Sequence, residues 1–163
     1  MRNGRPFTFL ISHSTFLMII RPMLFEDLDQ VAAIDEKSMP SPWSKILFEE
    51  ELRRSMARYF TAEDGAGRVM GYLGYWEAPF EAHLITVAVN PDDRRKGVGR
   101  ALLTHALDYA FKTGATLATL EVRAGNEGAQ ALYESIGFRL VAIRKKYYAD
   151  NQEDAQVMLK DLP

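Results

Sequence analysis

The clearest chemical signal in this sequence is a turn rich in arginine, lysine and glycine at residues 90–100 (NPDDRRKGVGR). It follows an apolar, strand-like segment and precedes a long helical pattern, so its last residues would form the start of a helix. Backbone N–H groups at a helix start have no intrahelical acceptor, and the helix dipole adds positive charge there. Gly97 and Gly99 lack a Cβ, so a phosphate can approach the backbone closely. The turn therefore predicts an anion site that suits a pyrophosphate.

Three alternatives compete with the pyrophosphate site. A P-loop requires Gly-x-x-x-x-Gly-Lys-Ser/Thr, which the turn does not contain. A dinucleotide fingerprint requires Gly-x-Gly-x-x-Gly, and Leu102 occupies its third glycine position. Glu121 does lie near the place where that motif has its acid, about 20 residues further on, but the chain is too short for a dinucleotide domain plus a substrate domain. A plain basic loop between a strand and a helix is the third alternative.

The composition excludes several other kinds of site. The chain has 163 residues, enough for one domain with a hydrophobic core. It contains no cysteine, which excludes a disulfide scaffold, a thiolate nucleophile and a cysteine zinc site. Three scattered histidines without a His-Glu-x-x-His motif predict that there is no metal site. A formal net charge of −2 argues against direct binding of nucleic acid, which usually needs a basic surface.

Residues 1–17 stand apart from the rest of the chain. Arg2 and Arg5 precede an apolar-leaning run at residues 7–20, which is the outline of a secretory signal peptide. Polar residues at positions 12–15 interrupt that run, no small-residue cleavage site follows, and a membrane span needs about 20 mostly apolar residues. We therefore expect residues 1–17 to be an N-terminal extension upstream of a functional start at Met18. We expect residues 18–163 to form a single cytoplasmic domain without membrane contact.

Hydrophobic periodicity and turn residues predict the elements that position the basic turn. Strands are predicted at residues 19–21, 59–63, 69–77, 83–89, 116–122, 138–147 and 156–159. Helices are predicted at residues 26–37, 45–56, 99–113 and 127–136, with Ser44 as an N-cap and glycines after the last two. The order β-α-α-β-β-β-α-β-α-β-β predicts an α/β fold in which helices cover both faces of a sheet.

The turn and its flanking elements resemble the acetyl-coenzyme A signature of the GNAT superfamily of N-acetyltransferases, Arg/Gln-x-x-Gly-x-Gly/Ala, at residues 94–99. The predicted order of elements is also that of the GNAT fold, whose central sheet is mixed but mostly antiparallel. Further segments resemble the RimI-type branch, which acetylates the N-terminal alanine of a ribosomal protein. These segments are residues 42–44 (PWS), 120–126 (LEVRAGN), 131–138 (ALYESIGF), 144–148 (RKKYY) and 153–155 (EDA). The resemblance extends over nearly all of residues 18–163.

The resemblance implies two catalytic residues. Glu121 matches the general base of RimI-type enzymes, and an α-amino group with a pKa of about 8 needs only a modest base. Tyr133 matches the general acid, because a phenol stays protonated at neutral pH and can donate to the sulfur of coenzyme A. The residues alone favour a surface glutamate paired with Arg123 or a lysine for Glu121, and a helix tyrosine packed on the sheet is a common interpretation for Tyr133.

The resemblance also implies a binding site for acetyl-coenzyme A as co-substrate. Backbone groups of the strand before the turn would contact the pantetheine arm, and the turn would hold the pyrophosphate. Asn126 would hydrogen-bond the arm, cap the following helix, or do both. The implied cofactor residues are Val87, Ala88, Val89, Arg94, Arg95, Lys96, Gly97, Val98, Gly99, Arg100 and Asn126.

Four residues are candidates for the acceptor side of the site: Trp43, Glu77, Tyr147 and Tyr148. For Trp43 a core anchor is the favoured interpretation. Side chains alternate along a strand, so only one of the two tyrosines is expected to face the acceptor.

The function that the resemblance implies is transfer of an acetyl group from acetyl-coenzyme A to the N-terminal amine, an alanine, of a small-subunit ribosomal protein. One alternative is a GNAT enzyme that acetylates small amines such as polyamines, aminoglycosides or amino acids. Another is a catalytically weak acetyl-coenzyme A-binding module. The presence of both Glu121 and Tyr133 argues against the module.

Overall fold

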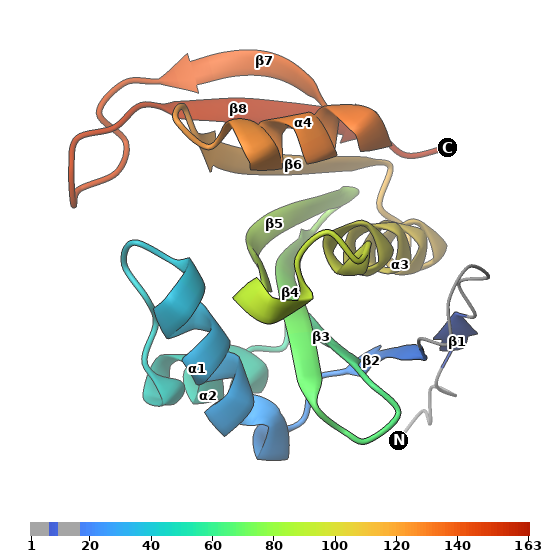
Figure 1. Ribbon diagram of the computed structural model, residues 1–163. Coiled ribbons are helices and arrows are strands. Elements are labelled where there is room, and N and C mark those ends of the chain that lie inside the picture. Colours follow the sequence, from blue (N-terminus) through green and yellow to red (C-terminus); the bar gives the residue numbers. More distant parts are fainter. Residues whose placement is uncertain (1–6, 10–16) are drawn as a thin grey trace.

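The computed structural model of the chain describes residues 7–9 and 17–163, which form one sheet with helices on both faces (Figure 1). The strands are β1 (Phe7–Phe9), β2 (Met18–Pro22), β3 (Ala57–Glu63), β4 (Val69–Ala78), β5 (Glu81–Val89), β6 (Leu117–Arg123), β7 (Arg139–Arg144) and β8 (Ala155–Asp161). The α-helices are α1 (Leu28–Ser38), α2 (Lys45–Arg53), α3 (Val98–Lys112) and α4 (Glu127–Ile136). From β2 onward this is the predicted order, and the predicted α/β fold is confirmed.

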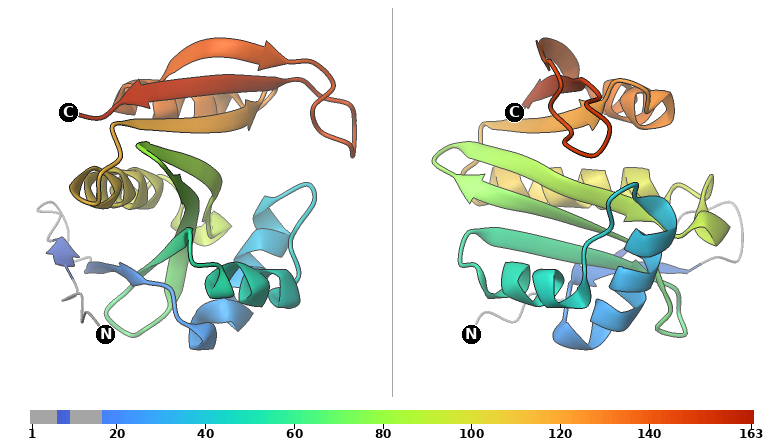
Figure 2. Two further views of the ribbon diagram at one scale, coloured as in Figure 1. Left: turned by 180° about the vertical axis from the view of Figure 1, so that it is seen from behind. Right: turned by 90° about the vertical axis from the view of Figure 1, so that its left-hand side faces the viewer.

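The strands of the sheet lie in the order β1-β2-β3-β4-β5-β6-β8-β7. Every neighbouring pair in the described ranges is antiparallel except β5 and β6, which run parallel. A parallel pair needs a crossover connection, and α3 supplies it (Figure 2). The prediction of a mixed, mostly antiparallel sheet is therefore confirmed. None of the helices in these ranges is long and apolar enough to cross a membrane.

The parallel pairing of β5 with β6 is short. Residues 81–83 of β5 pair with residues 117–119 of β6, and the pairing then stops. In the ladder between β4 and β5, Ile85 has no partner, which makes it a β-bulge. Because a bulge bends and twists its strand, β5 diverges from β6 beyond His83, while β6 stays paired with β8. Among the residues that the structure describes, the edge of β5 that faces β6 therefore has no strand partner from Leu84 onward.

Two hydrophobic clusters cover the two faces of the sheet. One includes Leu102 and Leu103 of α3, and the other includes Leu28 of α1 and Phe48 of α2. Figure 1 shows α3 on one side of the sheet and α1 and α2 on the other. Along β6, residues 118, 120 and 122 belong to the α3 cluster. Since side chains alternate along a strand, Glu121 points to the α1 face. The two faces thus carry different parts of the predicted site.

Two features near the chain ends differ from the sequence prediction. Phe7–Phe9 forms a strand, antiparallel to Met18–Ile20, that the sequence pattern does not predict. Residues 1–6 and 10–16 lie outside the described part, so the extension and the domain boundary at Met18 stay predictions. The strand predicted over residues 138–147 ends at Arg144, because the chain turns at Lys146, which has a φ of 51° and donates its N–H to Asp154.

The helix predicted over residues 45–56 ends at Arg53. Ser44 caps its first turn as predicted, accepting a hydrogen bond from the N–H of Leu47 at 3.3 Å. At the other end Arg54 is extended, with a ψ of 128°, and its guanidinium pairs with the buried carboxylate of Glu51 at 2.8 Å. The chain therefore leaves the helix at Arg54 and enters β3 at Ala57.

Candidate active site

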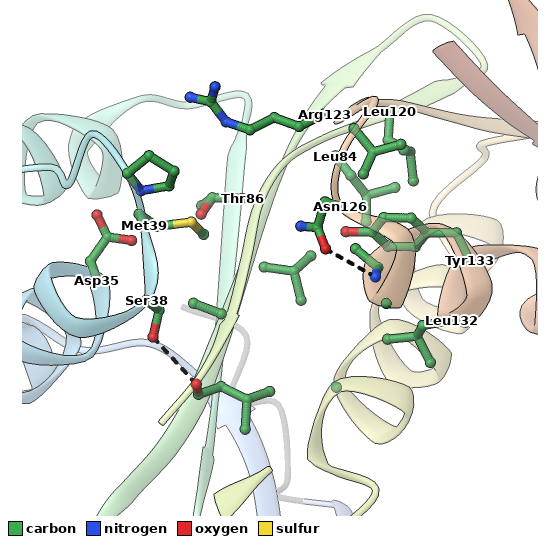
Figure 3. Close-up of a pocket in the computed structure, with 18 of the residues that line it drawn as sticks. Asp35, Ser38, Met39, Leu84, Thr86, Leu120, Arg123, Asn126, Leu132 and Tyr133 are labelled. Atoms are coloured by element: carbon green, nitrogen blue, oxygen red, sulfur yellow. Dashed lines mark hydrogen bonds between the residues drawn. The ribbon is translucent and has the colours of Figure 1, made fainter. Parts of the chain in front are cut away.

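A pocket of about 1130 Å³ opens where β5 and β6 diverge (Figure 3). Its lining comes from α1 and the loop after it, β5, the turn before α3, β6, α4 and the loop after β7. Because the divergence passes through the sheet, the pocket is lined from both faces: Asp35 and Ser38 on the α1 side, Leu132 and Tyr133 on the α4 side. We call this space the central pocket.

Most of the predicted site residues meet in the central pocket. The predicted residues that line it are Glu121, Tyr133, Val87, Ala88, Val89, Arg94, Arg95, Gly97, Val98, Gly99, Arg100 and Asn126. Lys96 does not line it, because its amine pairs with the carboxylate of Asp93 at 3.0 Å. Among the described residues, no group of three or more His, Asp or Glu side chains is placed to hold a metal ion.

Ion pairs at a buried carboxylate fix the shape of the basic turn. The Asp93 side chain is fully buried and accepts hydrogen bonds from the Arg68 guanidinium at 2.6 and 2.9 Å. Arg68, followed by Lys96, holds the pKa of Asp93 below its usual range despite the burial. The negative charge inside the turn is thereby balanced, and Arg95 and Arg100 add positive charge at the pocket wall. This is the charge distribution expected of an anion site.

The two glycines of the turn have different reasons to be glycine. Gly97 is the N-cap of α3 and has a φ of 79°, in the left-handed region that other residues avoid. A Cβ on Gly99 would lie 3.3 Å from Cδ2 of Leu132, so the Leu132 side chain would have to shift to make room for it. The first intrahelical hydrogen bond runs from the N–H of Ala101 to the carbonyl of Gly97. The N–H groups of residues 98–100 therefore have no acceptor within the helix, and they are the helix-start donors that the sequence predicts.

Replacing Gly97 with Ala is expected to lower the free energy of unfolding by about 1 kcal/mol, because the left-handed conformation strains any residue with a Cβ. The melting temperature should fall by about 2–4 °C in thermal unfolding. Gly128→Ala is the matched control: a Cβ there meets nothing within 4 Å inside helix α4, and Ala favours a helix, so stability should rise. An unchanged or higher melting temperature for Gly97→Ala would show that the turn is unstrained.

Asn126 begins α4 and faces the central pocket. Its side-chain oxygen accepts a hydrogen bond from the N–H of Ala129 at 3.2 Å, which caps the helix as predicted. The carboxamide also lines the pocket (Figure 3). Its NH₂ group is thus held in place for a hydrogen bond to a ligand.

Tyr133 reaches the same wall from about two turns further along α4. Its ring packs edge-on against Phe138, with centroids 5.9 Å apart. Figure 3 shows its hydroxyl beside Asn126 at the pocket. Burial raises the pKa of Tyr133 to about 12, so the phenol is protonated at neutral pH. Within residues 17–163 the hydroxyl has no hydrogen-bond partner, which leaves its proton for a group in the pocket.

Glu121 lies on the α1 face of the sheet and is held by two basic groups. One carboxylate oxygen is 3.0 Å from Nε2 of His83, and the other is 3.7 Å from Nε of Arg144. The hydrogen bond from His83, with a smaller effect of Arg144, keeps the pKa of Glu121 below its usual range although the side chain is only 11% exposed. The carboxylate is therefore ionised and oriented at neutral pH. The surface pairing with Arg123 is not formed, because Arg123 binds Asp150 at 2.8 Å.

His83 is a site residue that the sequence analysis missed. Its Nε2 contacts Glu121, and its Nδ1 lies 2.8 Å from the Thr119 hydroxyl. The hydrogen bond with Glu121 raises the pKa of His83. His83 and Glu121 are 38 positions apart in sequence, and only the parallel register that places His83 beside Thr119 brings them together. That register cannot be read from the pattern of either strand alone.

The His83–Glu121 pair makes stability depend on pH. The pKa of His83 is raised in the folded protein, so His83 contributes fully to the free energy of unfolding below its ordinary pKa of about 6.5. This contribution is lost as the pH rises through the pKa of the folded state. The lowered pKa of Glu121 means that its contribution is complete above about 4.5 and is lost as the pH falls. The pair is therefore strongest between about pH 4.5 and 6.5.

We expect His83→Gln to destabilise the protein more at pH 5.5 than at pH 9. The two losses in free energy of unfolding should differ by a value on the order of 1 kcal/mol, measured by thermal unfolding at each pH. His105→Gln is a control of opposite sign, because burial lowers the pKa of His105 and its contribution grows as the pH rises. Equal losses at both pH values for His83→Gln would mean that the imidazole is not charged in the folded protein.

Two of the four acceptor-side candidates reach the central pocket. Trp43 lines it and also packs against Phe48, with ring centroids 5.4 Å apart, so its role toward the acceptor stays a prediction beside its packing role. Glu77 lines a separate, smaller pocket near the turn between β4 and β5. Tyr148 lines the central pocket and Tyr147 does not. Both tyrosines lie in the loop after β7, so loop geometry and not strand alternation brings one of them to the site.

Comparisons with known proteins agree with this geometry. The model of the acetyltransferase (GNAT) family matches residues 27–138. The chain is 35% identical over 139 residues to a putative [ribosomal protein bS18]-alanine N-acetyltransferase of Bacillus subtilis, which covers 85% of this chain and 92% of that protein. It is 37% identical over 134 residues to the [ribosomal protein bS18]-alanine N-acetyltransferase of Escherichia coli, covering 81% of this chain and 89% of that protein. The crystal structure of the ribosomal-protein-S18-alanine N-acetyltransferase from Escherichia coli superposes with a TM-score of 0.82 at 35% identity, over 89% of this chain and 94% of that one.

Proposed function

Because this chain belongs to the acetyltransferase (GNAT) family and is an N-acetyltransferase, we propose that it acetylates the N-terminal alanine of a small-subunit ribosomal protein. Acetyl-coenzyme A supplies the acetyl group as a thioester. The relatives in Bacillus subtilis and Escherichia coli, which are named for an alanine acceptor on ribosomal protein bS18, support this choice of acceptor. A ribosomal acceptor implies that the enzyme acts in the cytoplasm.

The central pocket suits acetyl-coenzyme A in two places. The basic turn offers helix-start N–H groups and arginines to the pyrophosphate. The unpaired edge of β5 from Leu84 onward offers backbone N–H and C=O groups to the amide-containing pantetheine arm, as a neighbouring strand would. Asn126 adds a side-chain hydrogen bond on the opposite wall. These features lie along one continuous pocket, so a single elongated ligand can reach all of them.

The placement of Glu121 and Tyr133 carries the proposal. Both line one pocket, but Glu121 belongs to the α1 face of the sheet and Tyr133 to the α4 side. Glu121 accepts the proton that the amine loses as its nitrogen forms a bond to the acetyl carbon. Tyr133 donates its phenolic proton to the sulfur as the carbon–sulfur bond breaks, and the phenolate regains a proton from solvent. An acid and a base on two sides of one reaction centre are what acyl transfer to an amine needs.

A thiol-release assay tests the proposal. The purified full chain is incubated with acetyl-coenzyme A and a short peptide that begins Ala-Arg, and free thiol is measured over time. A panel of polyamines, aminoglycosides and amino acids is run beside it. We expect release that depends on the peptide and disappears when the same peptide carries an acetylated N-terminus. Release with small amines alone would overturn the proposed acceptor.

A further inference from the structure

A buried carboxylate forms part of the α1 wall of the central pocket. Asp35 of α1 is 2% exposed and accepts hydrogen bonds at both of its oxygens. One donor is the backbone N–H of Trp43 at 2.6 Å, and the other is the Tyr72 hydroxyl. Burial raises the pKa of Asp35, and the hydrogen bonds from Tyr72 and from the backbone of Trp43 counteract this by stabilising the carboxylate. Both partners act as donors, so Asp35 accepts both hydrogen bonds, and the catalytic roles described above leave it without a function.

The carboxylate fixes the direction of a short hydrogen-bond chain. A tyrosine hydroxyl has one proton, and that of Tyr72 is directed to Asp35. The Tyr72 oxygen also lies 3.1 Å from Oγ1 of Thr86. Because Tyr72 has no second proton, Thr86 must be the donor in that contact. The Thr86 hydroxyl therefore has only lone pairs left for other partners.

Thr86 presents this hydroxyl at the pocket. It lies in β5 just after the bulge and lines the central pocket between Asp35 and the wall that carries Tyr133 (Figure 3). Its contact with Tyr72 places it on the α1 face of the sheet, the face to which Glu121 points. A hydroxyl that can only accept favours a ligand that brings N–H groups and disfavours a carbonyl or carboxylate oxygen.

We propose that Thr86 is a specificity-determining residue that accepts a hydrogen bond from an N–H group of the acceptor, either its amine or its first peptide N–H. This inference rests on the proposed function, because it concerns the acceptor of the same reaction. Tyr72 and Asp35 act through Thr86 as positioning residues. They hold its proton away from the pocket, so that the hydroxyl stays an acceptor.

Steady-state kinetics of the full chain with the Ala-Arg peptide test the role of Thr86. Thr86→Val keeps the shape of the side chain and removes the hydroxyl, and we expect the peptide KM to rise about tenfold, the loss of roughly one hydrogen bond. The KM for acetyl-coenzyme A and kcat should stay within about twofold, because the lost contact is with the acceptor in its ground state. Thr86→Ser restores the hydroxyl and should restore the peptide KM. An unchanged peptide KM in Thr86→Val, or an equal rise in Thr86→Ser, would overturn the inference.

Tyr72→Phe tests the direction of the chain. Without the tyrosine oxygen, the Thr86 hydroxyl can turn its proton toward the pocket. The peptide KM should therefore rise severalfold when Tyr72→Phe is made in the protein that retains Thr86. In the Thr86→Val background the same change should add little, because the hydroxyl is already gone. Equal effects in both backgrounds would overturn the positioning role. If Tyr72→Phe does not fold, the comparison of valine and serine at position 86 still decides the role of Thr86.

Failure of this inference is distinguishable from failure of the proposed function. If wild type acetylates the peptide and Thr86→Val has the same peptide KM, the function stands and the role of Thr86 is wrong. If wild type acetylates small primary amines and not the peptide, the acceptor class is wrong. The comparison of KM between wild type and Thr86→Val is then made with the small amine that the wild type acetylates. It supports or overturns the role of Thr86 in the same way.

Discussion

Glu121→Gln is expected to lower kcat/KM for the peptide acceptor by about 10²–10⁴-fold, the usual contribution of a general base. Glutamine has the same shape and can still accept a hydrogen bond from His83 through its carbonyl, so the pocket should keep its form. It cannot accept the proton that the attacking amine must lose. The measurement is thiol release at saturating acetyl-coenzyme A with the Ala-Arg peptide.

The pH dependence sharpens this expectation. The pKa of Glu121 is lowered by His83, so the carboxylate is ionised over the whole neutral range and its own titration should not limit the rate there. The α-amine of the peptide, with a pKa of about 8, should instead set the rise of kcat/KM with pH. Above that pKa the wild-type kcat/KM should level off, whereas that of Glu121→Gln should keep rising, because hydroxide can take the proton that residue 121 no longer accepts. A ratio of the two values that stays constant over the whole pH range would mean that Glu121 serves only to bind the peptide.

Glu81→Gln is the matched control. Glu81 belongs to the same patch of polar side chains, 4.0 Å from Nδ1 of His83 and hydrogen-bonded to Thr119, but it does not line the central pocket. Its removal should change kcat/KM by less than about threefold. Equal losses for Glu81→Gln and Glu121→Gln would mean that the charge around His83, and not a base at Glu121, supports the rate.

Residues whose roles depend on local chain geometry could be placed from the sequence. The basic turn, Gly97 and the cap at Asn126 follow from a strand, a turn and a helix in succession, and the structure has all three at those positions. Glu121 could be placed near the end of its strand for the same reason. In each case the side chain or backbone group acts within a few residues of the signal that predicts it.

Features set by long-range pairing could not be placed in this way. The contact of His83 with Glu121 depends on the register between β5 and β6, and the Thr86 hydroxyl gains its direction from Tyr72 in another strand. Lys96 belongs to the signature by sequence, yet a buried carboxylate three residues earlier draws its amine away from the pocket. The bulge at Ile85, which opens the pocket, leaves no mark in the hydrophobic pattern of β5. Tertiary contacts decide each of these.

Tyr133→Phe is expected to lower kcat by about 10²-fold or more and to leave the KM for acetyl-coenzyme A nearly unchanged. The phenol is protonated at neutral pH because burial raises its pKa to about 12, and a proton supplied to the leaving sulfur accelerates the step in which the carbon–sulfur bond breaks. Phenylalanine keeps the ring that packs against Phe138 and removes only the proton donor. Steady-state kinetics over a range of acetyl-coenzyme A concentrations separate the two parameters.

The structure also predicts that this loss is chemical and not a loss of stability. Within residues 17–163 the Tyr133 hydroxyl has no hydrogen-bond partner, so its removal breaks no bond of the folded protein, and the melting temperature should stay within about 2 °C of the wild type. Tyr109→Phe is the matched control. Tyr109 lies on helix α3, away from the central pocket, and packs edge-on against Phe60 of β3. The kcat of this variant should equal that of the wild type. A Tyr133→Phe protein with kcat within about threefold of the wild type would mean that solvent, and not Tyr133, supplies the proton to the leaving sulfur. Glu121 would then be the one acid–base residue of the site, and the position of Tyr133 at the pocket would reflect packing alone.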